Sequence, residues 1–317
     1  MENLFFLCLR LKSYNQELKR LAIIFGSGGQ DGYYLNKLLI SKNISVINIS
    51  RKSGDFRGDV SNYKFVNSLI KKYLPNFIFH FAAVSSTKHE FLFENNLAIS
   101  TGTINILESI KNNNRSCKVF LSGSAMQFRN DGKPINESTP FHANSPYSVS
   151  RIHSVYLARY FREKFGLKTY IGYLFNHDSP FRSSKHINQR IAEFVVNISN
   201  GNNGKLIIGD LNAKKEFNHA EDIIEAIWIL VNQNNIFEAV IGSGLCYSIQ
   251  EWIEYCFETY NLNWNNYVEI DSNYEKQYNS LVSSPKLIKS LGWEPKNNMS
   301  SLADLMLKSI KKNDVKK

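Results

Sequence analysis

Short apolar runs alternate with amphipathic segments through the first half of the chain. The apolar runs are rich in Val, Ile, Leu and Phe, which is typical of buried strands. Strands are predicted at residues 21–25, 45–49, 77–81, 118–122 and 169–175. Helices are predicted between them at 32–41, 63–73 and 97–111, and from Pro146 to Gly166. Single helices between consecutive strands indicate right-handed crossovers, so we expect an α/β fold with a doubly wound parallel sheet of the Rossmann type.

The alternation weakens beyond Asn176, where loops rich in Asn, Ser and Gly separate two helices predicted near 222–232 and 249–260. This half is expected to form a smaller C-terminal cap over the edge of the sheet. The expected division of the chain is an N-terminal extension at 1–20, a Rossmann-type core at 21–175, a cap at 176–305 with elements returning to the core near 215–245, and a basic tail at 306–317.

Composition narrows the class of protein. The chain is 43% hydrophobic and 21% charged, which is ordinary for a globular protein, and no apolar run approaches the ~20 residues of a membrane helix. Its four cysteines have no paired spacing, so we expect no metal site, no disulfide framework and a cytoplasmic location. A net charge of +10 suits nucleic acid, an anionic membrane face or a polyanionic small ligand, and the sign of the charge alone does not choose among them. Nucleic acid is not an expected partner, because no basic stripe with interleaved aromatic residues is present.

A glycine-rich turn, GSGGQDG at residues 26–32, joins the first strand to the first helix. Glycine at Gly26, Gly29 and Gly32 allows a tight turn, close approach of backbone N–H groups to a pyrophosphate, and close packing of helix on strand. The spacing is not a strict G-x-G-x-x-G. Its position directly after a buried strand nevertheless favours a dinucleotide site, to which Gln30 and Asp31 would also contribute.

The end of the second strand carries Arg51 and Lys52, where an NAD-binding fold usually places an acidic residue on the ribose hydroxyls. Guanidinium and ammonium groups suit a 2′-phosphate, so NADP is the predicted cofactor and NAD the second choice. The alternative is that both are solvated surface charges. Weaker candidates for cofactor contacts are Asp59, Val60, Ala82 and Ala83.

A candidate catalytic group stands at the start of the long helix that begins at Pro146. Tyr147 and Arg151 lie one helical turn apart and project from the same face, and Ser122 and Ser124 end the preceding strand. A tyrosine, a cation and a serine at a strand's carboxyl edge can move a proton to or from a carbinol oxygen while hydride passes to a nicotinamide. The alternative is a half-buried helix tyrosine beside a solvent-exposed arginine.

Besides the glycine turn with Arg51 and Lys52, the chain carries four further motifs: SPYSVSR at 145–151, LFNHDSP at 174–180, IGDLNAKKEFNHAED at 208–222 and LGWEP at 291–295. Together they resemble the extended short-chain dehydrogenases (the NAD-dependent epimerase/dehydratase family), and most closely their GDP-mannose 4,6-dehydratase branch. The resemblance implies a Rossmann core with a nucleotide-sugar cap and a homo-oligomer. It also implies roles for individual residues, with Tyr147 as the acid/base, Ser124 as its hydrogen-bond partner, Ser85 and Asn176 at the sugar nucleotide, and Arg190 and Lys215 near the substrate diphosphate.

The chain departs from this family's pattern at three places. Members usually carry Lys at position 151 and Arg at position 215, and dehydratases supply a glutamate where this chain has Ala125 and Met126. Removal of the C5 proton needs such a base, whereas redox at C4 does not. We therefore expect an NADP-dependent enzyme that oxidises, reduces or epimerises a nucleotide sugar at C4, with a GDP-hexose as the expected substrate.

Two alternatives stay open at this point. One is a true GDP-mannose 4,6-dehydratase whose base is relocated, with Glu137 and Asp178 as candidate carboxylates. The other is a catalytically weakened protein that only binds sugar nucleotides, which the arginine at position 151 and the missing glutamate would both favour.

Overall fold

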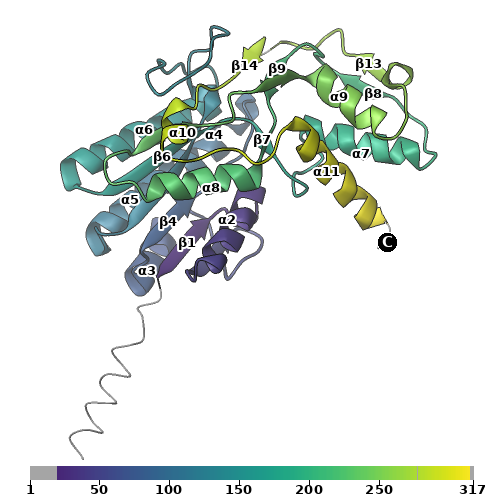
Figure 1. Cartoon of the computed structure of the whole chain (residues 1–317). Coiled ribbons are helices and arrows are strands. Elements are labelled where there is room, and N and C mark those ends of the chain that lie inside the picture. The colour runs from purple at the N-terminus through teal and green to yellow at the C-terminus, as the bar shows by residue number, and fades with distance from the viewer. Residues whose placement is uncertain (1–19, 277, 315–317) are drawn as a thin grey trace, which may run out of the picture.

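The computed structural model describes residues 20–276 and 278–314, with side chains to Lys311 (Figure 1). Apart from Arg20, the expected N-terminal extension lies outside these residues. None of the helices described is long and apolar enough to cross a membrane.

The core is one parallel sheet of seven strands in the order β11-β6-β5-β4-β1-β2-β3. The predicted fold class is therefore confirmed, and each of the five predicted strands is present. Strands β3 and β11 were not predicted, because one is very short and the other lies in the half of the chain where the alternation fades. The strands are β1 (Leu21–Phe25), β2 (Ser45–Ser50), β3 (Phe56–Arg57), β4 (Phe77–His80), β5 (Lys118–Ser124), β6 (Lys168–Leu174) and β11 (Glu238–Ile241).

Helices cover both faces of this sheet. Alternate side chains of β1 point to opposite faces, so Ile23 and Phe25 pack with α3, α5 and α6, whereas Ala22 and Ile24 pack with α2 and α8. The helices are α2 (Gln30–Ser41), α3 (Tyr63–Tyr73), α5 (Gly102–Asn113), α6 (Pro146–Phe165) and α8 (Ala220–Val231).

The long helix α6, which carries the candidate catalytic tyrosine, has the predicted ends. The Ser145 hydroxyl accepts a hydrogen bond from the Ser148 N–H at 3.2 Å, and Pro146 occupies the first helical position. Gly166 ends the helix in the left-handed region with φ +68°. The helix predicted at 97–111 differs, because Asn96–Thr101 form a π-helical segment that leads into α5.

A third apolar cluster forms the cap, which lies at one end of the sheet (Figure 1). It is built from α7 (Ile187–Ser199), α9 (Ile249–Glu258) and α11 (Met299–Asp314), beside the short pair β8 (Leu206–Ile208) and β13 (Val268–Ile270). Helix α11 crosses the boundary at 306 where a basic tail was expected to begin. Met306 and Leu307 are buried in the cap cluster, and the basic side chains follow on the same helix.

Short elements connect core and cap. Strand β9 (Lys214–Glu216) pairs with β12 (Cys246–Ser248) and β14 (Ser280–Leu281), and β7 (His177–Asp178) pairs with β10 (Asn218–His219). Buried Glu216 of β9 accepts hydrogen bonds from two backbone N–H groups in the adjoining loops, that of Ser243 before β12 at 2.7 Å and that of Ser283 after β14 at 2.6 Å. The remaining elements are η1 (His89–Phe91), α4 (Leu92–Asn95), η3 (Ala125–Gln127), η4 (Trp264–Asn266) and α10 (Lys286–Ser290).

Candidate active site

The glycine turn after β1 has two positions that admit no side chain. Gly26 has φ +90°, and a Cβ there would lie 2.5 Å from the Ala82 nitrogen. A Cβ on Gly32 would lie 2.5 Å from the Ser27 Cα. Gly29 is the N-cap of α2, and a Cβ there would meet only the Gly26 oxygen, at an ordinary 3.7 Å. The packing of the turn therefore requires glycine at Gly26 and Gly32. At Gly29 the space beside the backbone is not filled by neighbouring atoms, so a ligand can approach the turn there.

A cleft of about 480 Å³ opens above this turn, at the carboxyl ends of β1, β2 and β4. The cleft includes every predicted cofactor residue except Gly32, which packs inside the turn. The predicted residues that line it are Gly26, Gly29, Gln30, Asp31, Arg51, Lys52, Asp59, Val60, Ala82 and Ala83.

A tight loop after β2 presents the two basic residues to this cleft. The Ser50 hydroxyl accepts from the N–H groups of Lys52 at 3.2 Å and Ser53 at 2.8 Å, and it donates to the Ser53 carbonyl at 2.7 Å. Arg51 and Lys52 are exposed and make no ion pair among the described residues. Both cations are therefore free to meet an anionic group.

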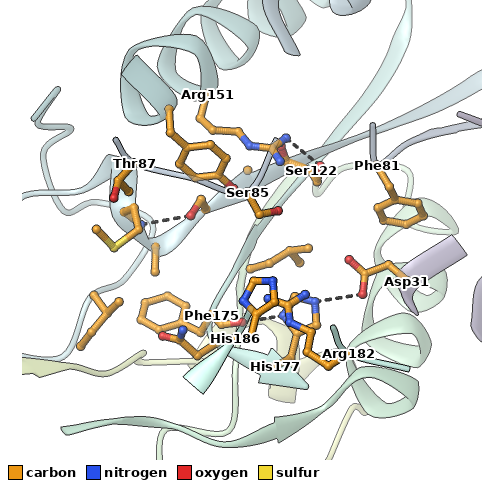
Figure 2. Close-up of a pocket in the computed structure, with 18 residues that line it drawn as sticks. Asp31, Phe81, Ser85, Thr87, Ser122, Arg151, Phe175, His177, Arg182 and His186 are labelled. Carbon is orange, nitrogen blue, oxygen red and sulfur yellow. Dashed lines mark hydrogen bonds and ion pairs between the residues drawn. The ribbon is translucent and has the colours of Figure 1, made fainter. Parts of the chain in front are cut away.

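A second, smaller cleft of about 230 Å³ adjoins the first and contains the candidate catalytic group. Tyr147 and Arg151 reach it from α6, Ser122 and Ser124 from the end of β5, and Met126 from η3. Figure 2 shows Arg151 and Ser122 on one side of this catalytic cleft and His177, Arg182 and His186 on the facing side. The structure thus brings together residues from both halves of the chain.

Arg151 turns toward β5. Its Nη1 donates to the Ser122 hydroxyl at 2.7 Å and to the Ser122 carbonyl, and its guanidinium carbon lies 5.0 Å from the centre of the Tyr147 ring. The Ser122 hydroxyl in turn donates to the His80 carbonyl at 3.0 Å. Burial and the Arg151 charge lower the pKa of His80 to about 3, so its ring is neutral beside the guanidinium. A buried cation is therefore fixed against the tyrosine ring.

Ser124 is buried, and its hydroxyl donates to no acceptor among the residues that the structure describes. Its Oγ accepts from the Met126 N–H at 3.2 Å, and its own N–H donates to the Gln127 side chain at 2.8 Å. These bonds cap η3 and fix the direction of the serine side chain. The free O–H can serve a ligand oxygen in the cleft.

Of the four predicted substrate residues, two line the catalytic cleft and two lie outside both clefts. Ser85 and Asn176 line the catalytic cleft. Arg190 is exposed and donates to the Ile207 carbonyl at 3.3 Å, while Lys215 is buried with its Nζ 5.2 Å from the centre of the Phe217 ring, and neither lines either cleft. Burial lowers the pKa of Lys215 to about 8.

Sequence reasoning missed three residues of this site. His177 Nε2 lies 3.0 Å from the Asp31 carboxylate, and Arg182 lines both clefts and forms a 3.0 Å ion pair with Asp178. Burial and the Arg182 charge lower the pKa of His186 to about 4. The motif at 174–180 contains His177 but did not indicate that its side chain lines the cleft. Nothing in the sequence predicted that Arg182 and His186 also line it.

The two relocated carboxylates considered from the sequence lie elsewhere. Glu137 accepts from the Val240 N–H at 2.8 Å at the edge of the sheet, and buried Asp178 accepts from Asn188 at 2.7 Å. Neither lines the catalytic cleft, where Asp31 is the one acidic side chain among the described residues.

Comparison with known proteins agrees with this architecture of a dinucleotide cleft beside a tyrosine cleft. The model of the family GDP-mannose 4,6 dehydratase matches residues 23–306, and the chain belongs to that family. The GDP-mannose 4,6 dehydratase 1 of Arabidopsis thaliana is 28% identical over 91% of this chain and 89% of its own length. The Dictyostelium discoideum enzyme is 28% identical over 92% and 96%. The family falls within the nicotinamide-dependent epimerases and dehydratases of nucleotide sugars.

Solved structures of low sequence identity share the fold. UDP-glucose 4-epimerase of Thermus thermophilus, solved with NAD, has a TM-score of 0.80 at 19% identity, covering 92% of this chain and 99% of that one. RMD from Pseudomonas aeruginosa, solved with NADPH, has a TM-score of 0.82 at 18% identity, covering 93% and 99%.

Proposed function

We propose that this protein is an NADP-dependent enzyme that oxidises, reduces or epimerises a GDP-hexose at C4 and does not efficiently dehydrate it. The observation that carries the proposal is the wall of the catalytic cleft beside Ser124, which consists of Ala125 and Met126. Elimination needs a base at C5, and general acid–base help is typically worth ~10²–10⁴-fold. Asp31 is a poor substitute, because its carboxylate is already paired with His177.

The cofactor cleft fits a nicotinamide dinucleotide. The N-terminus of α2 and the open turn at Gly29 suit a pyrophosphate, and Arg51 and Lys52 suit a 2′-phosphate. When bound, a nicotinamide dinucleotide would supply hydride acceptance and return at C4.

The chain's own residues handle the proton that accompanies hydride transfer. Tyr147 takes the proton of the C4 hydroxyl in oxidation and returns it in reduction. Ser124 donates its free O–H to the same oxygen and holds it beside the tyrosine. The Arg151 guanidinium, 5.0 Å from the ring centre, stabilises negative charge on Tyr147 but cannot release a proton into a relay.

The first prediction is a preference for NADP that depends on Arg51. Arg51→Ala should weaken NADP binding about tenfold or more and leave NAD binding within about twofold, because the contact serves the 2′-phosphate, and charge-assisted hydrogen bonds are worth about 1.5–3 kcal/mol. Titration of both cofactors against wild type and variant checks this, with exposed Arg57→Ala on the neighbouring strand as a control. NAD binding to the wild type as tightly as NADP would contradict the assignment.

A second prediction concerns the product. GDP-mannose or its 4-keto form, incubated with cofactor, should give a product of unchanged mass or one that differs by two hydrogens, as redox and epimerisation at C4 require. UDP and dTDP hexoses should react at least about tenfold more slowly, because the motifs at 174–180 and 208–222 match the GDP-mannose branch. Mass spectrometry of the nucleotide sugar tests both points. Rapid loss of water from GDP-mannose would overturn the proposal.

One observation favours a second candidate function, a sugar-nucleotide-binding protein with little catalysis. The Nη1 group of Arg151 already donates to Ser122, so fewer of the guanidinium's N–H groups remain to bind a ligand. The product assay separates the two candidates, since a binding protein would bind both ligands without turnover.

We also propose that the protein forms a homo-oligomer through one helical face. The neighbouring elements α4, η2 (the π-helical segment Asn96–Thr101), α5 and α6 expose large apolar side chains, and such a patch is typical of an interface between chains. The side chains are Phe93, Leu97, Ile104, Val149, Tyr156 and Tyr160. A molar mass in solution at least twice that of the chain is expected, and the double variant Phe93→Ser, Tyr156→Ser should return it to that of the monomer. A wild-type monomer at micromolar concentration would contradict this.

A further inference from the structure

We propose that the ion pair between Asp31 and His177 couples the cofactor cleft to the catalytic cleft, so that each ligand binds more tightly when the other is present. The inference rests on the proposed function of the two clefts. Asp31 stands at the N-terminus of α2 and lines both clefts, whereas His177 lies in β7 and lines the catalytic cleft alone. The pair therefore spans the boundary between the two sites. Figure 2 shows the two side chains facing each other across a dashed line.

The first turn of α2 is fastened to the segment after β6 by four contacts. Gln30 Nε2 donates to the His177 carbonyl at 3.1 Å, and the Ser179 hydroxyl donates to Gln30 Oε1 at 2.9 Å. The Asp31–His177 pair adds a 3.0 Å contact, and the rings of Tyr33 and Phe181 pack against each other at a tilt of 40° with centroids 4.1 Å apart. Residues 146 or more positions apart in sequence are thus joined at the place where the clefts meet.

The pair is shielded and held in place. The side chains of His177 and Asp31 are 12% and 21% exposed, and His177 Nδ1 lies 2.7 Å from the Phe175 carbonyl. Burial would lower the pKa of His177, but the Asp31 charge and hydrogen bond outweigh it and leave the pKa above its ordinary value. The partners of the two ring nitrogens, a backbone carbonyl and a carboxylate, are both acceptors, so the doubly protonated ring satisfies both contacts.

Charge explains why cofactor binding would favour this contact. A pyrophosphate at the N-terminus of α2 would repel the Asp31 carboxylate, and the protonated His177 ring neutralises that carboxylate. The same contact holds the segment that supplies Asn176, Arg182 and His186 to the catalytic cleft. A ligand that fixes the α2 turn therefore orders part of the second site in advance, which lowers the entropy cost of the second binding event.

The test is the ratio of two dissociation constants measured on the full chain. Calorimetry gives the dissociation constant of GDP, an unreactive probe, without and with saturating NADP. A direct effect of a substitution on GDP binding cancels in this ratio. The proteins compared are wild type, Asp31→Asn, His177→Leu and their double variant, with His177→Gln as the conservative variant that keeps an N–H donor. Lys37→Gln is the matched control, because it breaks another ion pair of α2, that with Glu221 at 2.9 Å, away from both clefts.

In the wild type and in Lys37→Gln, NADP should tighten GDP binding at least about fivefold, the lower end of ordinary coupling. Asp31→Asn and His177→Leu should each bring the ratio to within about twofold of one, with no further loss in the double variant and partial recovery in His177→Gln. Asp31→Asn is nearly isosteric and carries the test if His177→Leu does not fold. Both ligands binding to folded variants with the wild-type ratio would overturn the coupling alone. A wild type that binds neither ligand would overturn the proposed function and the coupling with it.

Discussion

Tyr147→Phe should lower the rate of hydride transfer by about 10²–10⁴-fold while leaving cofactor and sugar-nucleotide affinities within about threefold of wild type. The substitution removes the one hydroxyl that α6 presents to the catalytic cleft beside Ser124, and it keeps the ring that packs 5.0 Å from the Arg151 guanidinium. The measurement is the absorbance change of the cofactor with GDP sugars under single-turnover conditions. Tyr156→Phe, on the exposed side of the same helix, is the control.

Substitutions at Arg151 should change the same rate of hydride transfer. They separate the effect of the positive charge beside Tyr147 from the effect of the hydrogen bonds that hold the side chain at Ser122. Arg151→Ala should be nearly as slow as Tyr147→Phe, since it leaves the tyrosine without a cation. Arg151→Lys should be faster than wild type, because a compact ammonium can approach the ligand rather than the strand end at Ser122. Ser122→Ala checks independently whether the contact with Ser122 keeps the Arg151 side chain at the end of β5, because it removes one of the two acceptors of the guanidinium there.

A wild type without turnover on any sugar would decide against this mechanism. If Tyr147→Phe then bound the same sugars unchanged, the binding-protein function would replace the enzyme. A Tyr147→Phe variant as active as wild type would instead place the acid/base on another residue of the cleft.

The sequence predicted the elements whose packing is local and strongly patterned. Strand β1 and helix α3 have the predicted bounds, and the ends of α6 follow from Pro146 and Gly166. The π-helical segment at Asn96–Thr101 was not predictable, because its apolar periodicity is that of an ordinary helix. Helix α11 was not predicted, because its basic second half was interpreted as a tail. Its first half carries the buried residues that complete the apolar cluster of the cap.

The candidate site likewise divides into a part that follows from local sequence pattern and a part that depends on contacts between distant segments. The residues that line the larger cleft could be predicted because they follow β1, β2, β3 and β4, neighbouring parallel strands whose carboxyl ends meet at one edge of the sheet. The facing wall of the catalytic cleft could not. His177, Arg182 and His186 reach Asp31 and Tyr147 only through the connection of β6 to the cap, and no local spacing encodes that contact.

Gly26→Ala should destabilise the protein by about 2–5 kcal/mol and abolish measurable NADP binding. Left-handed backbone costs a non-glycine residue about 1–2 kcal/mol, and overpacking adds about 1–3 kcal/mol. At Gly26 both apply, since φ is +90° and the new Cβ would lie 2.5 Å from the Ala82 nitrogen, a backbone atom that cannot move without shifting β4. Gly166→Ala is the matched control, with φ +68° and nothing within 4 Å of its Cβ, so it should cost only the conformational part and leave NADP binding intact. Denaturant unfolding of both variants gives the two free energies. Equal losses of stability would show that the turn relaxes around the methyl group and that its contact with the end of β4 is not what demands glycine there.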